Sequence, residues 1–226
     1  MLWRSSLAVR VGRFLHQNNF CTAASDVSKS TSWLQDGSLP KELLTFSGLL
    51  RHRANCRRKL IGLPHAAVLV PFCLVQGQLS LLFTWRSLLV GSHKNQVSFP
   101  GGKLDAQDKG DPVQASLRET QEEIGILPEN VITLGLFDDY RSINGYCVTP
   151  VIGFIGDIGR HKLKVNEREV QQVFMLSLAH LLNESNMRIE NTSRGTMPIY
   201  SGGPVEIWGL TACILRDILK IFPFEK

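Results

Sequence analysis

The sequence predicts an α/β fold in which a mixed β-sheet lies between helices. Apolar runs of strand length begin near residue 65 and recur through the rest of the chain. Helical patterns interrupt these runs at residues 112–125, 178–183 and 210–221. Their spacing is irregular, whereas a doubly wound sheet alternates strands and helices regularly. The 226 residues, 43% hydrophobic and 20% charged, can bury the core of one such domain.

The expected strands cover residues 66–74, 79–84, 131–137, 147–155 and 170–175. Gln76-Gly77-Gln78 separates the first two and predicts a β-hairpin, because glycine favours a tight turn. Residues 91–100 are expected to form a loop and a short strand, and the chain after residue 183 is expected to be extended. Pro112 and Gly125 bound the first helix of this region, because proline favours the first helical turn and glycine the position after the last.

The first 25 residues differ in composition from the rest of the chain. Arg4, Arg10 and Arg13 precede the first acidic residue, Asp26. On a helix, the apolar side chains at positions 7, 11, 14 and 15 would gather on one face, with the arginines mostly off it. This pattern is typical of a mitochondrial transit peptide, so we expect residues 1–25 to direct the chain to the mitochondrial matrix. The alternative is a disordered basic tail.

Residues 26–63 are predicted to form a linker and an N-terminal helical segment, before a catalytic domain at residues 64–226. Ser, Thr, Asp and Gly are frequent up to Pro40, and apolar residues at helical spacing predict a helix from residue 41 to about 60. Basic residues are concentrated between positions 51 and 59. They are compatible with contact to an anionic substrate or with a solvated helix face.

Charge, hydropathy and cysteine spacing exclude several classes of function. The net charge is +5, and three of the positive charges lie in the first 25 residues, so we expect no nucleic-acid partner. The apolar run at residues 66–75 is about half of the ~20 residues that a membrane helix needs, so we expect no membrane span. The five cysteines form no CxxC pair, which argues against a zinc site or a disulfide framework.

Three carboxylates in the predicted helix at residues 112–125 point to a divalent metal. Glu119, Glu122 and Glu123 are three and four residues apart, so they are expected on one side of the helix, where they repel each other. A cation would relieve that repulsion, and Mg²⁺ prefers carboxylate oxygens together with substrate phosphates and water. Arg118 can pair with a neighbouring carboxylate. The Gly101-Gly102 pair allows the preceding backbone to approach closely.

Residues 98–126 resemble the Nudix box, the motif of the Nudix hydrolase family. It runs Gly, five residues, Glu, seven residues, Arg-Glu, an apolar residue, any residue, Glu-Glu, any residue, Gly and an apolar residue. The matching positions here are Gly102, Arg118, Glu119, Glu122, Glu123, Gly125 and Ile126. There are three departures: Asp108 replaces the first Glu, nine residues separate it from Arg118, and Thr120 occupies the apolar position. These departures leave the role of Asp108 open.

An upstream stretch resembles the motif of the coenzyme A diphosphatase branch of that family. The motif has Leu-Leu-Thr-any-Arg, then an Arg and a Gly, then Phe-Pro-Gly-Gly. The chain has Phe83 for the second Leu, and Gly91 and Asn95 for the intervening Arg and Gly. The resemblance implies that the substrate is bound by Arg86, His93, Lys94, Gly101, Gly102 and Lys103.

The resemblance implies an α/β/α sandwich around a mixed sheet and a metal-dependent pyrophosphohydrolase. Coenzyme A or its acyl derivatives would be cleaved at the diphosphate to 3′,5′-ADP and 4′-phosphopantetheine or acyl-phosphopantetheine, with Mg²⁺ or Mn²⁺ as cofactor. Glu119 and Glu123 would be the main metal ligands and Glu122 a ligand or the base that orients water. Arg118 would hold these carboxylates in place, so the implied catalytic group is Arg118, Glu122 and Glu123.

Two other functions remain open. A Nudix hydrolase could act on another diphosphate, such as ADP-ribose, a dinucleotide or a capped RNA end. A Nudix-like binding module without catalysis is a weaker alternative, because such a module is expected to lose the metal carboxylates that this chain keeps. Outside the box, Glu167 and Glu169 could supply a general base or belong to a solvated run of charges.

Overall fold

The computed structural model describes residues 39–88, 95–193 and 195–224. The predicted transit peptide, the linker up to residue 38, His93 and Lys94 lie outside these residues. The helices are α2 (Lys41–Arg53), α3 (Pro112–Ile124), α4 (Leu178–Leu182) and α5 (Gly209–Ile221). The strands are β1 (His65–Val75), β2 (Gln78–Arg86), β3 (Val97–Ser98), β4 (Gly101–Lys103), β5 (Ile132–Leu136), β6 (Tyr140–Arg141), β7 (Cys147–Asp157), β8 (Val170–Ser177), β9 (Met187–Thr192) and β10 (Gly195–Tyr200).

The central sheet contains eight strands and is mixed, as the sequence predicts. Its main path runs β3-β2-β1-β7-β5, while β4 pairs with β1, β6 with β7 and β8 with β2. The pair of β1 and β7 is parallel, and the other pairs are antiparallel. The strands β9 and β10 form a separate two-stranded sheet, and Tyr200 of β10 also bridges to Ile207.

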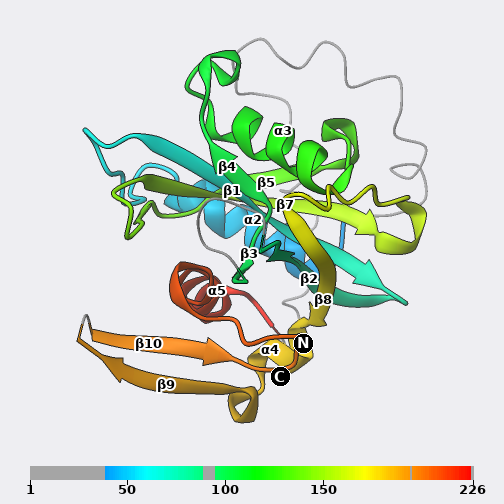
Figure 1. The fold of residues 1–226 in the computed structure, drawn as a ribbon. Helices are drawn as coiled ribbons and strands as arrows, with labels where there is room; N and C mark the ends of the chain where they lie inside the picture. The colour runs from blue at the N-terminus through cyan, green and yellow to red at the C-terminus, as the bar shows by residue number, and fades with distance from the viewer. Residues whose placement is uncertain (1–38, 89–94, 194, 225–226) are drawn as a thin grey trace, which may run out of the picture. The chain divides into compact units, whose positions relative to one another are not determined.

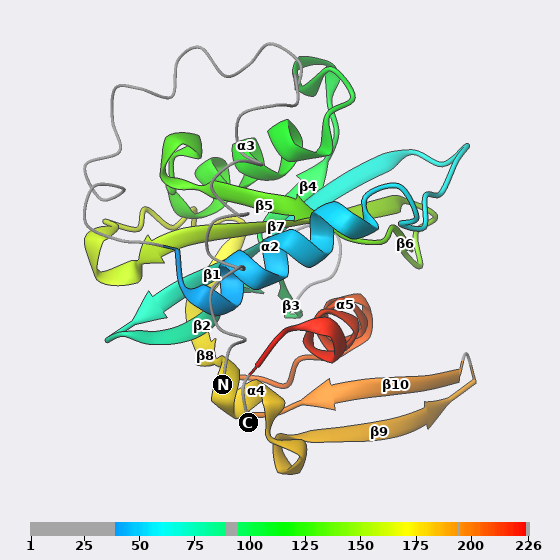
Figure 2. The ribbon, with the colours of Figure 1, turned by 180° about the vertical axis from the view of Figure 1, so that it is seen from behind.

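Helices cover both faces of the central sheet. Figure 1 shows α3 on one face and α5 on the other, and Figure 2 shows α2 on the same side as α5. The side chains of Leu69 in β1, Leu117 in α3 and Val151 in β7 pack together under α3. The opposite face carries the larger cluster, in which Phe46 of α2 and Phe72 of β1 contact Phe222 after α5. The expected α/β/α sandwich is confirmed.

The turn between β1 and β2 confirms the predicted hairpin. Gln76 and Gly77 both have positive φ angles, 51° and 81°, as a two-residue hairpin turn of this twist requires. The register places Val75 opposite Gln78. This hairpin leads into β2, which pairs with β1, β3 and β8 and ends at Arg86.

One expectation about the secondary structure was wrong, and another becomes more specific. The helix predicted to reach about residue 60 ends at Arg53, because the following backbone is held by another part of the chain. Arg58 N donates to Asp138 Oδ1, and Leu60 N donates to Asp139 Oδ2. The extended chain expected after residue 183 is present, and it forms the antiparallel pair of β9 and β10.

Among the described residues, no helix has the length and apolar character needed to cross a membrane.

Candidate active site

Helix α3 carries the predicted metal carboxylates and has the predicted ends. The Asp111 side chain accepts a hydrogen bond from Val113 N, Pro112 occupies the first turn, and Gly125 ends the helix with a φ of 77°. A side chain at Gly125 would also lie 2.8 Å from Lys164 Cβ. Proline and glycine therefore fix the two ends of α3, and the helix packs against β4.

The Gly101-Gly102 pair brings the backbone of β4 against α3. A Cβ at Gly102 would lie 2.4 Å from the carboxyl carbon of Glu119, and one at Gly101 would lie 2.3 Å from the carbonyl oxygen of Ala67. Gly101 has a φ of 151°, which favours glycine. A side chain at Gly101 would disturb the pairing with β1, and a side chain at Gly102 would displace the carboxyl group of Glu119.

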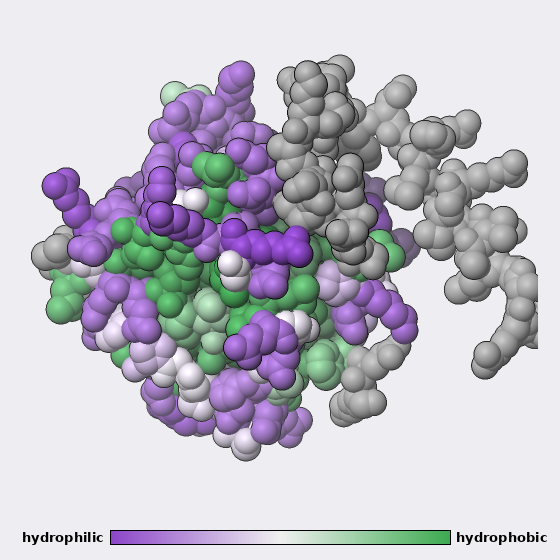
Figure 3. Space-filling view, turned by 90° about the vertical axis from the view of Figure 1, so that its right-hand side faces the viewer, coloured by the Kyte–Doolittle hydropathy of each residue, from purple (hydrophilic) through white to green (hydrophobic). Residues whose placement is uncertain are grey.

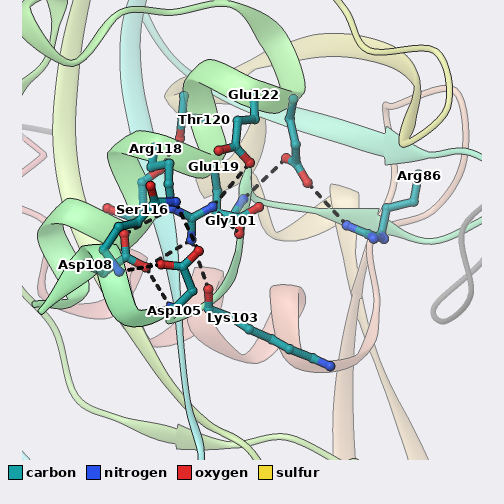
Figure 4. A network of polar contacts seen from close by, with 12 residues as sticks. Arg86, Gly101, Lys103, Asp105, Asp108, Ser116, Arg118, Glu119, Thr120 and Glu122 are labelled. Carbon is teal, nitrogen blue, oxygen red and sulfur yellow. Dashed lines mark hydrogen bonds and ion pairs between the residues drawn. The ribbon is translucent and has the colours of Figure 1, made fainter. Parts of the chain in front are cut away.

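Arg118 is the centre of a network of polar contacts in Figure 4. Its Nη1 donates to Glu119 Oε1 at 2.9 Å and to Glu122 Oε2 at 3.2 Å. Its Nη2 donates to the carbonyl oxygen of Lys103 at 3.1 Å, which joins the helix to β4. Arg118 therefore positions two of the predicted carboxylates, as the sequence led us to expect.

Asp108 holds Arg118 from the other side. Its two carboxylate oxygens each accept a bond of 3.0 Å, one from Nε and one from Nη2 of Arg118. Asp108 is 2% exposed, and Asp105 N also donates to it. The hydrogen bond from Arg118 holds the pKa of Asp108 below its usual value. The departure from the motif thus leaves a carboxylate that orients Arg118.

The three glutamates of α3 differ strongly in exposure. The side chains of Glu119 and Glu123 are 17% and 2% exposed, whereas that of Glu122 is 54% exposed. The expectation that all three crowd one side is therefore only partly right, because Glu122 lies at the solvent edge of the group. Glu119 and Glu123 are the pair that β4 covers.

Glu123 is a buried carboxylate with weak compensation. Its Oε1 lies 3.4 Å from Arg86 Nη1, and its Oε2 accepts a bond of 3.3 Å from Gly101 N. Both distances exceed the usual length for charged hydrogen bonds. Burial raises the pKa of Glu123 to about 8, against the opposing effects of Arg86 and Gly101 N. Burial likewise raises the pKa of Glu119.

A further carboxylate, Glu169, belongs to the same group. Its negative charge adds to the factors that raise the pKa of both Glu119 and Glu123. The loop before β8 is tied to the site, because Asn166 N donates to Glu123 O and Ser87 N donates to Glu169 O. Sequence reasoning left Glu169 undecided between a base and a solvated charge, because nothing in the local sequence shows that this loop closes on α3.

The donor set fits a divalent cation that prefers oxygen ligands. Glu119, Glu123 and Glu169 can supply carboxylates, and the bare backbone of Gly102 allows Glu119 to lie against β4. No three His, Cys, Asp or Glu side chains in the described part of the chain already converge as a metal-binding group. Arginines instead hold the acidic side chains whose charge a metal would neutralise.

The remaining predicted substrate contacts lie at different distances from this group. Arg86 reaches Glu123, and Gly101 and Gly102 form the adjoining backbone. Lys103 extends away from the carboxylates in Figure 4, and its ammonium lies 5.0 Å from the centre of the Tyr146 ring. The roles proposed for His93 and Lys94 fall outside the described residues.

Three arginines of the basic run, one at the end of α2 and two after it, contact other parts of the protein. Arg53 pairs with Asp138 and Arg57 with Asp139, while the Arg58 guanidinium lies over the Tyr140 ring. Although burial alone would raise the pKa of Asp139, hydrogen bonds from Thr149, Leu60 and Arg57 hold it below its usual value. These arginines are structural, and neither of the two expected explanations describes them.

Within the described part of the chain, neither the exposed apolar residues nor the cavity identifies another site. Figure 3 shows hydrophobic residues between hydrophilic ones on one side of the molecule, and exposed apolar side chains such as Ile61, Ile143 and Ile189 belong to separate segments. A cavity of about 250 Å³ lies between residues 57–61, the start of β1 and the start of α3. None of the site carboxylates lines it.

Comparison with known proteins agrees with this geometry. Residues 63–194 match the NUDIX domain model. The chain is 42% identical over 162 residues to the mitochondrial coenzyme A diphosphatase NUDT8 of Mus musculus, covering 69% of this chain and 77% of the relative. The Homo sapiens protein of that name is 40% identical over 194 residues, covering 80% of each chain.

A third relative is the uncharacterized Nudix hydrolase NudL of Escherichia fergusonii. It is 35% identical over 182 residues, covering 75% of this chain and 88% of the relative. The family match spans more than half of the chain and includes α3, β4 and the loop that carries Glu169. The chain belongs to the Nudix family and is a Nudix hydrolase.

Proposed function

We propose that this Nudix hydrolase is a metal-dependent coenzyme A diphosphatase that releases 3′,5′-ADP and 4′-phosphopantetheine, or acyl-phosphopantetheine from acyl derivatives. The observation that carries the proposal is the buried, weakly compensated Glu123, with Glu119 next to it on α3 and against Gly102. The choice of substrate is supported by the upstream motif and by relatives at 40% and 42% identity that are named coenzyme A diphosphatases.

The positions of the carboxylates suggest different roles in metal binding and in orienting water. Glu119 and Glu123 are the proposed main metal ligands, and Glu169 is a third candidate. When bound, Mg²⁺ or Mn²⁺ would neutralise charge at the diphosphate and acidify water. Glu122, at the solvent edge, is a candidate to orient the attacking water. Arg118 and Asp108 position the glutamates and do not contact the substrate.

The proposed location is the mitochondrial matrix. It is supported by the arginine-rich composition of residues 1–25 and by two relatives that are named as mitochondrial proteins. A reporter fused to residues 1–30 should enter mitochondria, and replacing Arg4, Arg10 and Arg13 by Glu should leave it in the cytosol. A cytosolic reporter with the unchanged segment would refute the location.

A substrate panel tests the activity. Purified protein with Mg²⁺ or Mn²⁺ is incubated with coenzyme A, dephospho-coenzyme A, ADP-ribose and a dinucleotide, and the products are identified by mass. We expect coenzyme A to give the highest kcat/KM, with dephospho-coenzyme A poorer because it lacks the 3′-phosphate. Equal or faster turnover of ADP-ribose would favour a different diphosphate substrate. No turnover of any of them would favour a binding module.

A further inference from the structure

Arg86 has a buried donor without a partner. Its Nε is inaccessible to solvent and has no hydrogen-bond acceptor among the residues that the structure describes. One terminal nitrogen, Nη1, lies 3.4 Å from Glu123 Oε1, and the side chain as a whole is 21% exposed. A guanidinium that is close to solvent but incompletely bonded can accept another anionic partner.

The backbone fixes where this side chain starts. Arg86 N donates to the carbonyl oxygen of Gln96 at 2.9 Å, and Arg86 pairs with Val170 at a register shift between β2 and β8. In Figure 4, Arg86 approaches the carboxylates from the side opposite Arg118. The two arginines therefore lie on opposite sides of the acidic group, and only Arg118 is fully bonded to it.

The contact between Arg86 and Glu123 conflicts with metal binding at the same carboxylate. A divalent cation on Glu123 would lie within a few ångströms of the guanidinium, and like charges at about 4 Å repel strongly in a site partly removed from water. The contact is also long for a charged hydrogen bond, so little is lost when it opens. Arginine offers a planar fork of donors that suits phosphate oxygens.

We propose that Arg86 exchanges partners, neutralising Glu123 before the metal binds and turning to the substrate diphosphate once the metal has taken Glu123. This inference rests on the proposed metal-dependent function. It makes Arg86 a competitor of the metal and a ligand of the substrate. Removing its charge should therefore change the two affinities in opposite directions.

Titration calorimetry of the full chain tests the exchange. Mg²⁺ binding is measured for all variants in one alkaline buffer, because burial raises the pKa of Glu123 and a higher pH favours its ionised form. Binding of methylenediphosphonate, a diphosphate analogue that is not hydrolysed, is then measured at saturating Mg²⁺. Arg188→Gln is the matched control, because Arg188 pairs with Glu190 and Glu206 away from the site.

We expect Arg86→Gln to bind Mg²⁺ about tenfold more tightly and methylenediphosphonate about tenfold more weakly than the wild type. Arg86→Lys keeps the charge but loses the fork, so its Mg²⁺ affinity should resemble that of the wild type while diphosphonate binding weakens. Arg188→Gln should change neither. If the glutamine variant does not fold, Arg86→Ala takes its place, because it removes the same charge and carries the same two expectations.

Each other pattern overturns the exchange. If both affinities fall in Arg86→Gln, Arg86 only supports Glu123. If diphosphonate binding alone weakens, Arg86 binds substrate without competing with the metal, and if it does not weaken, Arg86 is not a substrate ligand. Failure of the wild type itself to bind Mg²⁺ would instead remove the proposed function, which keeps the two failures distinct.

Discussion

Two clusters of arginines and carboxylates differ in how their charges are balanced. In the first, Arg53, Arg57 and Arg58 surround Asp138 and Asp139, and the pKa of Asp139 is lowered. The second contains the arginines Arg86 and Arg118 with more carboxylates, namely Asp108, Glu119, Glu122 and Glu123. There the pKa of Glu123 is raised.

The difference separates a structural role from a chemical one. The Asp139 cluster, as we call the first, is neutralised by its own arginines and fixes residues 53–60 to the sheet. The Glu123 cluster, the second, keeps an excess of negative charge beside a glycine backbone, and Glu169 adds to it. Such an excess is costly to bury unless a cation is bound, which is the reason to place the metal there.

The largest expected effect comes from Glu123→Gln. This change keeps the shape of the side chain but removes the charge of a proposed metal ligand, so kcat/KM should fall by a factor of about a thousand or more. The fold should persist. Turnover at saturating Mg²⁺ is the measurement, with Glu129→Gln as a control of equal charge, because Glu129 is exposed beyond the end of α3. Near-normal turnover of Glu123→Gln would contradict the assignment.

Gly102→Ala tests the approach of β4 to the Glu123 cluster. The new Cβ would meet the carboxyl group of Glu119, the flexible end of a side chain, so Glu119 should move while the fold survives. We expect kcat/KM to fall by about tenfold to a hundredfold, with little loss of stability. Gly48→Ala is the matched control, because a Cβ there meets nothing within 4 Å. Equal activities of the two variants would refute the close approach.

Asp139→Asn tests the other cluster. It leaves Arg57, whose side chain is 12% exposed, without its carboxylate, so the free energy of unfolding should fall by about 3 kcal/mol. Activity per folded molecule should be unchanged, because no residue of the Asp139 cluster contacts the Glu123 cluster in the described chain. Urea unfolding and turnover give both quantities. A loss of activity without a loss of stability would contradict the structural role of the Asp139 cluster.

The pH dependence of stability should carry the signature of Glu123. The pKa of Glu123 in the folded state, about 8, lies above the ordinary glutamate value. At pH values between these two pKa values, the folded protein therefore binds more protons than the unfolded one. Without metal, the stability associated with this group is complete at low pH and is lost as the pH rises through about 8. Urea unfolding in EDTA at pH 6 and 9 should show this loss in the wild type and a smaller one in Glu123→Gln.

Lys59→Gln is expected to have the smallest effect. Lys59 is an exposed member of the basic run, so the free energy of unfolding should stay within about 0.5 kcal/mol of the wild-type value. The KM should also stay close to that of the wild type. A clear increase in KM for coenzyme A would show that this run contacts the substrate after all.

Local signals explain which parts of the fold and site could be predicted. Asp111, Pro112 and Gly125 lie within the segment that they shape, so the bounds of α3 could be derived from the sequence. Gln76 and Gly77 likewise define their own hairpin. The Nudix box located the carboxylates, because its spacing is set by one helix and one adjoining loop.

Contacts between distant segments explain what could not be predicted. The end of α2 depends on Asp138 and Asp139, about 80 residues away, which hold the backbone after Arg53. The proximity of Glu169 to α3 depends on the loop before β8. The exposure of Glu122 follows from how α3 is rotated against β4, which helical spacing alone does not fix.

The central claim is that the uncompensated charge of the Glu123 cluster binds the metal, and the most direct test is Mg²⁺ titration by calorimetry. Wild type, Glu129→Gln and Glu123→Gln are compared in one buffer. The account predicts that the first two bind Mg²⁺ with the same affinity and that Glu123→Gln binds it at least tenfold more weakly. Equal Mg²⁺ affinity in all three proteins would contradict the claim and place the metal elsewhere.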